Sequence, residues 1–175
     1  ARKGIIIKDP VVLERLPTCK TAIFDKTGTL TYGQAALIGI TPLLGFDKEE
    51  LLQQVASLER FSKHPLATAV LKAAQKSHLS LSDVEQVQEK PGEGLVGTLK
   101  GKVIQITNRE KFTLKYPNQA AHLPPIEQGM ECVILIDDKV AALFRFQDTL
   151  RIDGQLFIHH LAPIHHFEKI MIVSG

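Results

Sequence analysis

Several residue types are scarce in this chain, and each scarcity excludes a class of protein. The 175 residues contain no tryptophan, two cysteines and only 6% aromatic residues. No apolar run approaches the roughly 18 residues that a membrane-spanning helix needs. Cys19 and Cys132 lie far apart without Cys-x-x-Cys spacing, which argues against a disulfide framework and is typical of a reducing compartment. A net charge of +2 gives no strong field for nucleic acid, so we expect no nucleic-acid partner.

The remaining composition is that of a soluble globular protein. Hydrophobic residues make up 44% of the chain and charged residues 23%, and the length is sufficient to bury a core. The N-terminus lacks the apolar stretch of a signal peptide. Because the chain begins without Met and stops just after an apolar run, we expect a soluble piece of a longer protein.

The two ends of the chain share an α/β pattern. Residues 22–24 predict a short strand that ends at Asp25 in a polar turn rich in Gly and Thr. Residues 151–161 predict a helix, and residues 170–173 predict a second short strand. Short strands that alternate with helices are typical of an α/β domain.

The middle of the chain starts with a helical pattern. Apolar residues recur at helical spacing between residues 47 and 75, and Pro65 interrupts them, which predicts two helices joined by a polar corner at 61–64. Asp47, three residues before Glu50, predicts the N-cap of the first helix. Pro65 suits the first turn of the second helix.

The rest of the middle segment is rich in β-forming residues. Residues 84–106 predict antiparallel strands around glycine-rich turns, and residues 132–136 and 140–146 predict a hairpin. Residues 110–129 have no clear pattern. The chain therefore indicates an α/β domain into which a second domain is inserted, an antiparallel sheet flanked by a helix hairpin.

The strongest chemical signal is the heptad Asp-Lys-Thr-Gly-Thr-Leu-Thr, which begins at Asp25. An Asp at the carboxyl end of a strand lies at the ligand-facing edge of an α/β sheet, and its carboxylate can attack the terminal phosphorus of ATP. The Asp25 carboxylate and the Thr27 carbonyl are oxygen ligands suited to Mg²⁺. Lys26, the Gly28 amide and Thr29 would stabilise phosphate charge. An isolated Asp-Lys pair would be an ordinary turn, whereas the full heptad is far more specific.

The heptad resembles the phosphorylation signature of P-type ATPases, and the resemblance extends along the chain. The sequence Ser-Lys-His-Pro-Leu from Ser62, with Glu59 five residues before His64, is similar to a motif of the heavy-metal-transporting (type IB, CPx-type) branch. This similarity implies that His64 stacks on or hydrogen-bonds adenine, while Glu59 accepts from its exocyclic amine. Ser62 and Pro65 complete the expected nucleotide site.

A glycine-rich stretch resembles a further nucleotide-binding motif of the same branch. At Gly92 and Gly94, the missing side chains would let the backbone approach the nucleotide. In isolation the stretch is equally typical of a hairpin turn. Where the family usually has another glycine before an Asn, this chain has Thr107 before Asn108, so no role is carried over to Thr107.

The C-terminal part contains two more resemblances. Asp148 and Arg151 match an Asp-x-x-Arg hinge that returns to the phosphorylation domain. Ser174 and Gly175 resemble the end of a strand that binds phosphate. Four histidines between residues 159 and 166 have no defined ligand spacing, so we expect a solvated surface there rather than a metal site.

The resemblance implies a HAD-like, Rossmann-type phosphorylation domain over 1–32 and 148–175, with an α+β nucleotide-binding domain over 33–147. It implies ATP and Mg²⁺ as cofactors, and a heavy-metal ion carried through membrane helices absent from this chain. The intact protein is expected in a bacterial inner membrane, with this region on the cytosolic face. Copper and zinc/cadmium pumps share these motifs, which therefore select the branch and not the metal.

Later catalytic residues of the family fall beyond this sequence, namely a Lys and a Gly-Asp-Gly-x-Asn-Asp site for Mg²⁺. We therefore expect nucleotide binding with little or no turnover. Two alternatives remain open. A regulatory nucleotide-binding module would not need Asp25, and a soluble HAD phosphatase usually has a second Asp at the position of Thr27.

Overall fold

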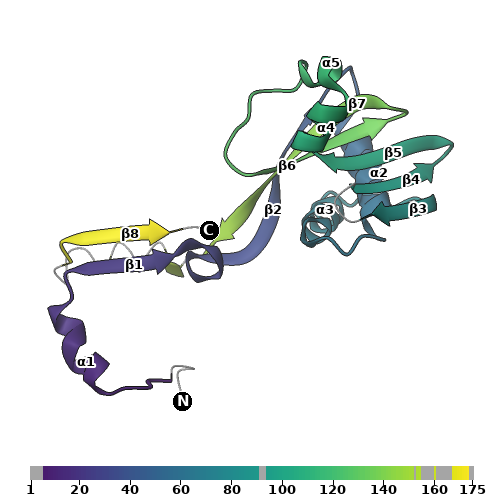
Figure 1. Cartoon of the computed structure of the whole chain (residues 1–175). Helices are drawn as coiled ribbons and strands as arrows, with labels where there is room; N and C mark the ends of the chain where they lie inside the picture. The colour runs from purple at the N-terminus through teal and green to yellow at the C-terminus, as the bar shows by residue number, and fades with distance from the viewer. Residues whose placement is uncertain (1–5, 91–93, 152, 155–159, 161–166, 174–175) are drawn as a thin grey trace. The chain divides into compact units, whose positions relative to one another are not determined.

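The computed structural model describes residues 6–90, 94–151, 153–154, 160 and 167–173. The chain divides into two compact units (Figure 1). The first unit combines residues 1–33 with 149–175, and the second comprises residues 34–148.

The first unit is built around two parallel strands. Its elements are the helix α1 (Val11–Arg15), the 3₁₀ turn η1 (Leu16–Thr18), and the strands β1 (Thr21–Asp25) and β8 (Lys169–Val173). Asp25 pairs with Val173, so the carboxyl ends of both strands meet at one edge. The strands predicted over 22–24 and 170–173 are confirmed, whereas most of the helix predicted over 151–161 lies outside the described residues.

The second unit contains a six-stranded sheet in the order β2-β7-β6-β5-β4-β3 (Figure 1). The strands are β2 (Thr31–Pro42), β3 (Glu85–Lys90), β4 (Gly94–Leu99), β5 (Lys102–Asn108), β6 (Met130–Ile136) and β7 (Lys139–Leu150). Neighbouring strands from β3 to β7 pair antiparallel. The antiparallel sheet and the β6–β7 hairpin are confirmed. The long strand β2 was not predicted.

Two helices join at the predicted polar corner. They are α2 (Lys48–Glu59) and α3 (Pro65–Lys76). The Asp47 carboxylate accepts hydrogen bonds from the amides of Glu49 and Glu50, each at 2.9 Å, which confirms the predicted cap. Pro65 stands at the start of α3, where its missing N–H leaves no helical bond unmade.

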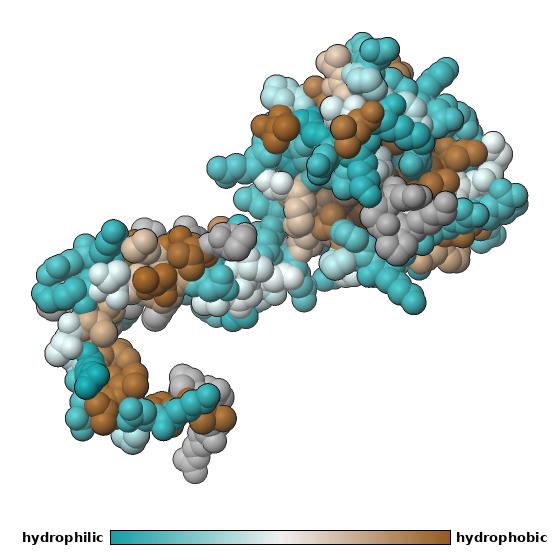
Figure 2. All heavy atoms as spheres, in the orientation of Figure 1, coloured by the Kyte–Doolittle hydropathy of each residue, from teal (hydrophilic) through white to brown (hydrophobic). Residues whose placement is uncertain are grey.

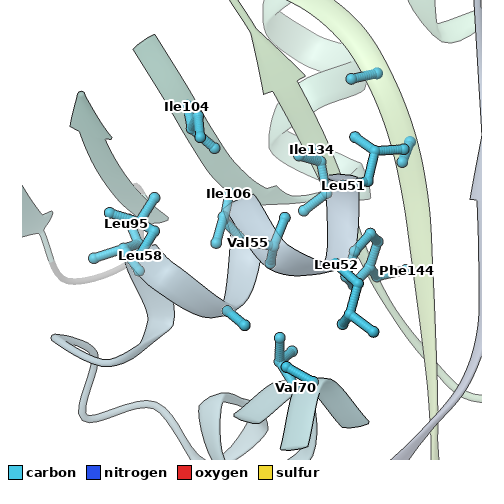
Figure 3. Close-up of a cluster of buried hydrophobic side chains, with 14 of the residues drawn as sticks. Leu51, Leu52, Val55, Leu58, Val70, Leu95, Ile104, Ile106, Ile134 and Phe144 are labelled. Atoms are coloured by element: carbon cyan, nitrogen blue, oxygen red, sulfur yellow. The ribbon is translucent and has the colours of Figure 1, made fainter. Parts of the chain in front are cut away.

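Successive residues of β6 point to opposite faces of the sheet, and those from Val133 to Ile136 are buried on both faces. Ile134 and Ile136 of β6 belong to the larger core, which includes side chains from α2 and α3 (Figure 3). Val133 and Leu135 belong to a second core around Phe112. The helices α4 (Arg109–Lys115) and α5 (Pro117–Ala120) contribute to that second core, and they form in the stretch where the sequence has no clear pattern.

Candidate functional site

Asp25 occupies the carboxyl end of β1, and a tight loop follows it. The loop is the π-type turn η2 (Lys26–Leu30), which is broken by non-helical backbone at Thr27 and by φ +78° at Gly28. A Cβ added at Gly28 would meet nothing within 4 Å, so glycine serves the backbone conformation here rather than a close approach. The Asp25 side chain is exposed at this edge.

The loop after Asp25 is held by the hydroxyl of Thr31, a residue to which the sequence analysis assigned no role. Thr31 is only 1% exposed. Its Oγ1 accepts from the amides of Gly28 (3.1 Å) and Gly33 (3.4 Å) and donates to the Lys26 carbonyl (3.2 Å). The hydroxyl proton and both lone pairs of this oxygen thus each take part in a hydrogen bond. This buried hydroxyl fixes the backbone that presents Gly28.

The other predicted site residues of the first unit are either exposed or outside the described part of the chain. Lys26, Thr27 and Thr29 are exposed in the loop that follows Asp25. Arg151 returns to the heptad, where its Nε donates to the Thr31 carbonyl at 3.2 Å. Its guanidinium also lies 5.4 Å from the centre of the Tyr32 ring. The expected phosphate-binding residues Ser174 and Gly175 lie outside the described residues.

A cavity of about 760 Å³ opens in the second unit beside the corner between α2 and α3. The predicted nucleotide residues that line it are Glu59, Ser62, His64, Pro65 and Gly94. Gly92 lies outside the described residues. Apolar side chains of Leu66, Leu95, Ile106 and Met130 also line the cavity, which gives it a surface suited to a flat aromatic base.

Glu59 is the most unusual side chain of the cavity. It is only 6% exposed, and its Oε2 has no hydrogen-bond partner among the described residues. Burial raises the pKa of Glu59 from 4.5 to about 7, with a smaller contribution from the charge of Glu89. A buried acceptor without a partner is costly, and a ligand that donates a hydrogen would satisfy it.

His64 has its imidazole fixed by the backbone of α3. It is the N-cap residue of this helix, and its Nδ1 accepts a hydrogen bond from the Leu66 amide at 3.2 Å. An accepting Nδ1 carries no proton, so the hydrogen of the neutral ring lies on Nε2. His64 therefore offers one N–H donor at the cavity.

Gly94 has a packing reason to lack a side chain. Its φ is +101°, and an added Cβ would come within 2.0 Å of the Ile106 carbonyl oxygen on β5. Only glycine permits this close approach of β4 to β5 at the wall of the cavity. The glycine is thus required by the sheet, whatever ligand the cavity holds.

Several further residues of the cavity were missed by the sequence analysis. Glu89 of β3 accepts hydrogen bonds from the Ser62 hydroxyl and the Lys63 amide, which lower the pKa of its carboxyl. Cys132 of β6 faces the same space, and burial together with the charge of Glu59 raises the pKa of its thiol to about 12. Neither belongs to a local motif, so only the pairing of strands brings them here.

A third carboxylate of the cavity, Glu131, is neutralised by two arginines. Its oxygens lie 3.0 Å from Arg109 Nε and 3.4 Å from Arg145 Nε, and the Glu131 side chain is 6% exposed. The Asn108 side chain caps α4 by accepting from the Lys111 amide at 2.8 Å. Thr107 is buried and lines the cavity.

Two kinds of site are not found among the residues that the structure describes. No group of three or more His, Cys, Asp or Glu side chains is arranged to hold a metal ion. No described helix combines the length and apolarity needed to cross a membrane. Of the four histidines between 159 and 166, only His160 is among the described residues.

Comparison with known proteins decides the family. A model of the haloacid dehalogenase-like hydrolases matches residues 19–168. The chain belongs to this family. The predicted resemblance to heavy-metal P-type ATPases is also confirmed, because such proteins match it across its whole length.

Relatives include pumps named for different metals. A probable copper-transporting ATPase of Synechococcus elongatus is 40% identical over 176 residues, which is 100% of this chain and 22% of that protein. A zinc/cadmium/lead-transporting P-type ATPase of Escherichia coli is 33% identical over 92% of this chain and 22% of its own length. The chain thus spans about a fifth of the length of these relatives.

Solved structures give the same answer for the fold. The catalytic domain of the CPx-ATPase CopB-B, studied for its conformational changes upon nucleotide binding, matches with a TM-score of 0.74 and 28% identity over 99% of this chain and 61% of that one. A zinc-transporting PIB-type ATPase in its E2.Pi state matches with a TM-score of 0.77 and 28% identity over 99% of this chain and 28% of that one. The predicted fold class is confirmed.

Proposed function

We propose that this chain is the ATP-binding and phosphorylation region of a heavy-metal-transporting P-type ATPase. The second unit is the nucleotide-binding domain, and the first unit belongs to the phosphorylation domain. The observation that carries the proposal is the cavity in which the Oε2 atom of the buried Glu59, without a hydrogen-bond partner among the described residues, lies in the same lining as His64.

Adenine fits the chemistry of this cavity. Its exocyclic amine donates a hydrogen bond, which the Oε2 atom of Glu59 lacks. The Nε2–H of His64 complements a ring nitrogen or a phosphate oxygen of the nucleotide. Guanine carries a carbonyl oxygen where adenine has the amine, so an ionised Glu59 would face a second acceptor. The cavity is therefore expected to prefer ATP over GTP.

Asp25 is the proposed nucleophile. One carboxylate oxygen of Asp25 would form a bond to the γ-phosphorus of ATP, the bond from that phosphorus to the bridging oxygen would break, and ADP would leave with the electron pair. The exposed position of Asp25 at the end of β1 leaves its carboxylate accessible. The Thr31 hydroxyl holds the adjoining loop, so that the Gly28 backbone is fixed before the phosphate arrives.

Mg²⁺ fits the donors present near Asp25. The Asp25 carboxylate and the Thr27 carbonyl supply the oxygen ligands that this hard cation prefers. When bound, Mg²⁺ would neutralise charge on the transferred phosphoryl group. Lys26 and Thr29 are the residues of this chain proposed to stabilise the remaining phosphate oxygens, together with Ser174 and Gly175.

The role proposed for the intact protein is supported by its relatives. Phosphorylation at Asp25 would drive transport of a heavy-metal ion across a membrane, with the present region on the cytosolic face of a bacterial inner membrane. Both copper and zinc/cadmium/lead pumps are among the relatives, so the proposal names the class of cargo and not one metal. Nucleotide binding with little or no turnover is proposed for this chain alone.

A titration of the whole chain with ATP and GTP, followed by amide NMR shifts, tests the proposal. We expect ATP to shift signals of Glu59, His64 and Gly94 and to bind about tenfold more tightly than GTP. Glu59→Gln and His64→Ala should each weaken ATP binding, whereas Glu85→Gln, on an exposed position of β3, should not. No shift at millimolar ATP would overturn the proposal.

A further inference from the structure

The corner between α2 and α3 is tied to a strand that is distant in the sequence. The Ser62 hydroxyl donates to Glu89 Oε1 at 2.7 Å, and the Lys63 amide donates to Glu89 Oε2 at 3.2 Å. Both oxygens of one carboxylate on β3 are thus used by consecutive residues of the corner. A carboxylate that accepts two such bonds is held more firmly than one with a single partner.

The direction of these bonds leaves Ser62 with little freedom. An ionised carboxylate only accepts, so the single Ser62 proton points to Glu89. The His64 amide donates to the same Ser62 oxygen at 3.0 Å. The hydroxyl would therefore have to break its bond to Glu89 before it could donate to a ligand.

The series of bonds continues to the imidazole of His64. The Ser62 oxygen holds the backbone N–H of His64, and the His64 ring caps α3 through the Leu66 amide at 3.2 Å. Backbone and ring of His64 are consequently fixed from two sides. The hydrogen on Nε2 is the donor that this arrangement leaves for a ligand in the cavity.

We propose that Glu89 is a positioning residue for nucleotide binding, which acts through Ser62 to hold the capped form of His64 with its hydrogen on Nε2. Ser62 is then a link in this arrangement and not a nucleotide contact. The inference rests on the proposed function for the identity of the ligand. The hydrogen bonds involve only residues of this chain, so they can be tested separately from ATP binding.

The negative charge of Glu89, taken by itself, predicts the opposite effect on the affinity for ATP. Glu89 lines the cavity, and an unpaired negative charge repels a triphosphate. If Glu89 acted only as a charge, its removal would tighten ATP binding. If Glu89 positions His64, its removal weakens binding, because His64 must then be ordered when the ligand arrives. The sign of the change separates the two roles.

The experiment compares three variants of the whole chain: Glu89→Ala, Glu89→Gln and the control Glu85→Ala. Glu85 is exposed on the same strand and does not line the cavity. Imidazole ¹⁵N NMR without nucleotide reports the tautomer of His64, and an ATP titration reports affinity. We expect Glu89→Ala to weaken ATP binding about fivefold and to mix the two His64 tautomers.

The amide oxygen of Glu89→Gln still accepts from Ser62, so this variant should keep the Nε2–H tautomer and nearly the original affinity. Glu85→Ala should match the unmodified chain in both measurements. Unchanged His64 signals in Glu89→Ala, or ATP binding as tight as or tighter than that of the unmodified chain, would overturn the inference. If the unmodified chain binds no ATP, the proposed function fails, while the tautomer comparison still decides the role of Glu89.

Discussion

The two units of this chain differ in how completely they cover their apolar residues. In the second unit, side chains of β6 and β7 are buried in two cores, and residues such as Phe144 and Val133 are 1% and 0% exposed. In the described part of the first unit, Leu30 and Thr31 are the buried residues, while Ile23 and Ile172 remain 61% and 55% exposed. Figure 2 shows brown apolar atoms over α1 and the β1–β8 pair.

Because of this difference, we expect the second unit to supply most of the folding stability, whereas the proposed nucleophile lies in the first unit. The cavity proposed to bind nucleotide lies in the unit that supplies its own core. The proposed nucleophile stands on a strand pair with apolar side chains in water, where burial by other protein atoms would release about 25 cal/mol per Å². Unfolding experiments on this chain should therefore report mainly on the second unit.

The largest contrast is expected from one large truncation in each unit. Phe144→Ala removes a fully buried ring from the larger core and should lower the free energy of unfolding by about 3–5 kcal/mol. Ile23→Ala removes an exposed side chain and should change it by less than about 0.5 kcal/mol. Urea denaturation followed by circular dichroism measures both, and equal effects would refute the contrast between the units.

Replacing one glycine in each unit by alanine compares how much each unit depends on glycine in its backbone. In Gly94→Ala, the added Cβ would lie 2.0 Å from a carbonyl oxygen at a positive φ, so we expect a loss of about 2–4 kcal/mol. In Gly28→Ala the φ is also positive but the space is open, so the loss should be about 1 kcal/mol. Thermal unfolding of both variants tests this order, and a larger loss for Gly28→Ala would contradict it.

The buried carboxyl of Glu59 should make the second unit depend on pH. Its folded pKa of about 7 lies above its usual 4.5, so the folded state holds the proton more tightly than the unfolded state. The stabilisation is complete below pH 4.5 and is lost as the pH rises through about 7, on the order of 3 kcal/mol in total.

Glu59→Gln removes the titrating group while keeping its shape. Urea denaturation at pH 5 and pH 8 should show a smaller loss of stability in this variant than in the unmodified chain. An identical pH dependence in the two proteins would show that other groups cause it.

The smallest effect is expected from the hydroxyl that holds the loop after Asp25. Thr31→Val keeps the shape of the side chain but removes the acceptor for the amides of Gly28 and Gly33. We expect local opening to become easier by about 1 kcal/mol, seen as roughly fivefold faster hydrogen exchange at these two amides. Thr29→Val, at an exposed position, is the matched control and should leave the exchange unchanged.

Local signals in the sequence predicted local structure well. The cap at Asp47, the start of α3 at Pro65 and the strand that ends at Asp25 each depend on neighbouring residues, and all three are confirmed. The strand β2 was missed, because its sequence has no regular alternation of apolar and polar residues. The helix α4 was missed because seven residues are too few for a clear period.

Only some residues of the cavity could be predicted from the sequence. Glu59 and His64 were predicted because they belong to one motif. The raised pKa of Glu59 was not predicted, because it results from burial in the folded protein. Glu89 and Cys132 were missed, since they reach the cavity through the pairing of β3 and β6 with other strands. The sequence did not predict that the Ser62 hydroxyl donates to Glu89, 27 residues later in the chain.

Thr107 carries a consequence for chemical biology. It lines the main cavity and also a second cavity of about 360 Å³, whose lining includes Lys111 and Tyr116. A shorter side chain at this position, as in Thr107→Gly, is therefore expected to enlarge the space at one or both cavities. A nucleotide analogue with an enlarged base is then expected to bind the Thr107→Gly variant more tightly than the unmodified chain, which would allow that variant to be addressed selectively.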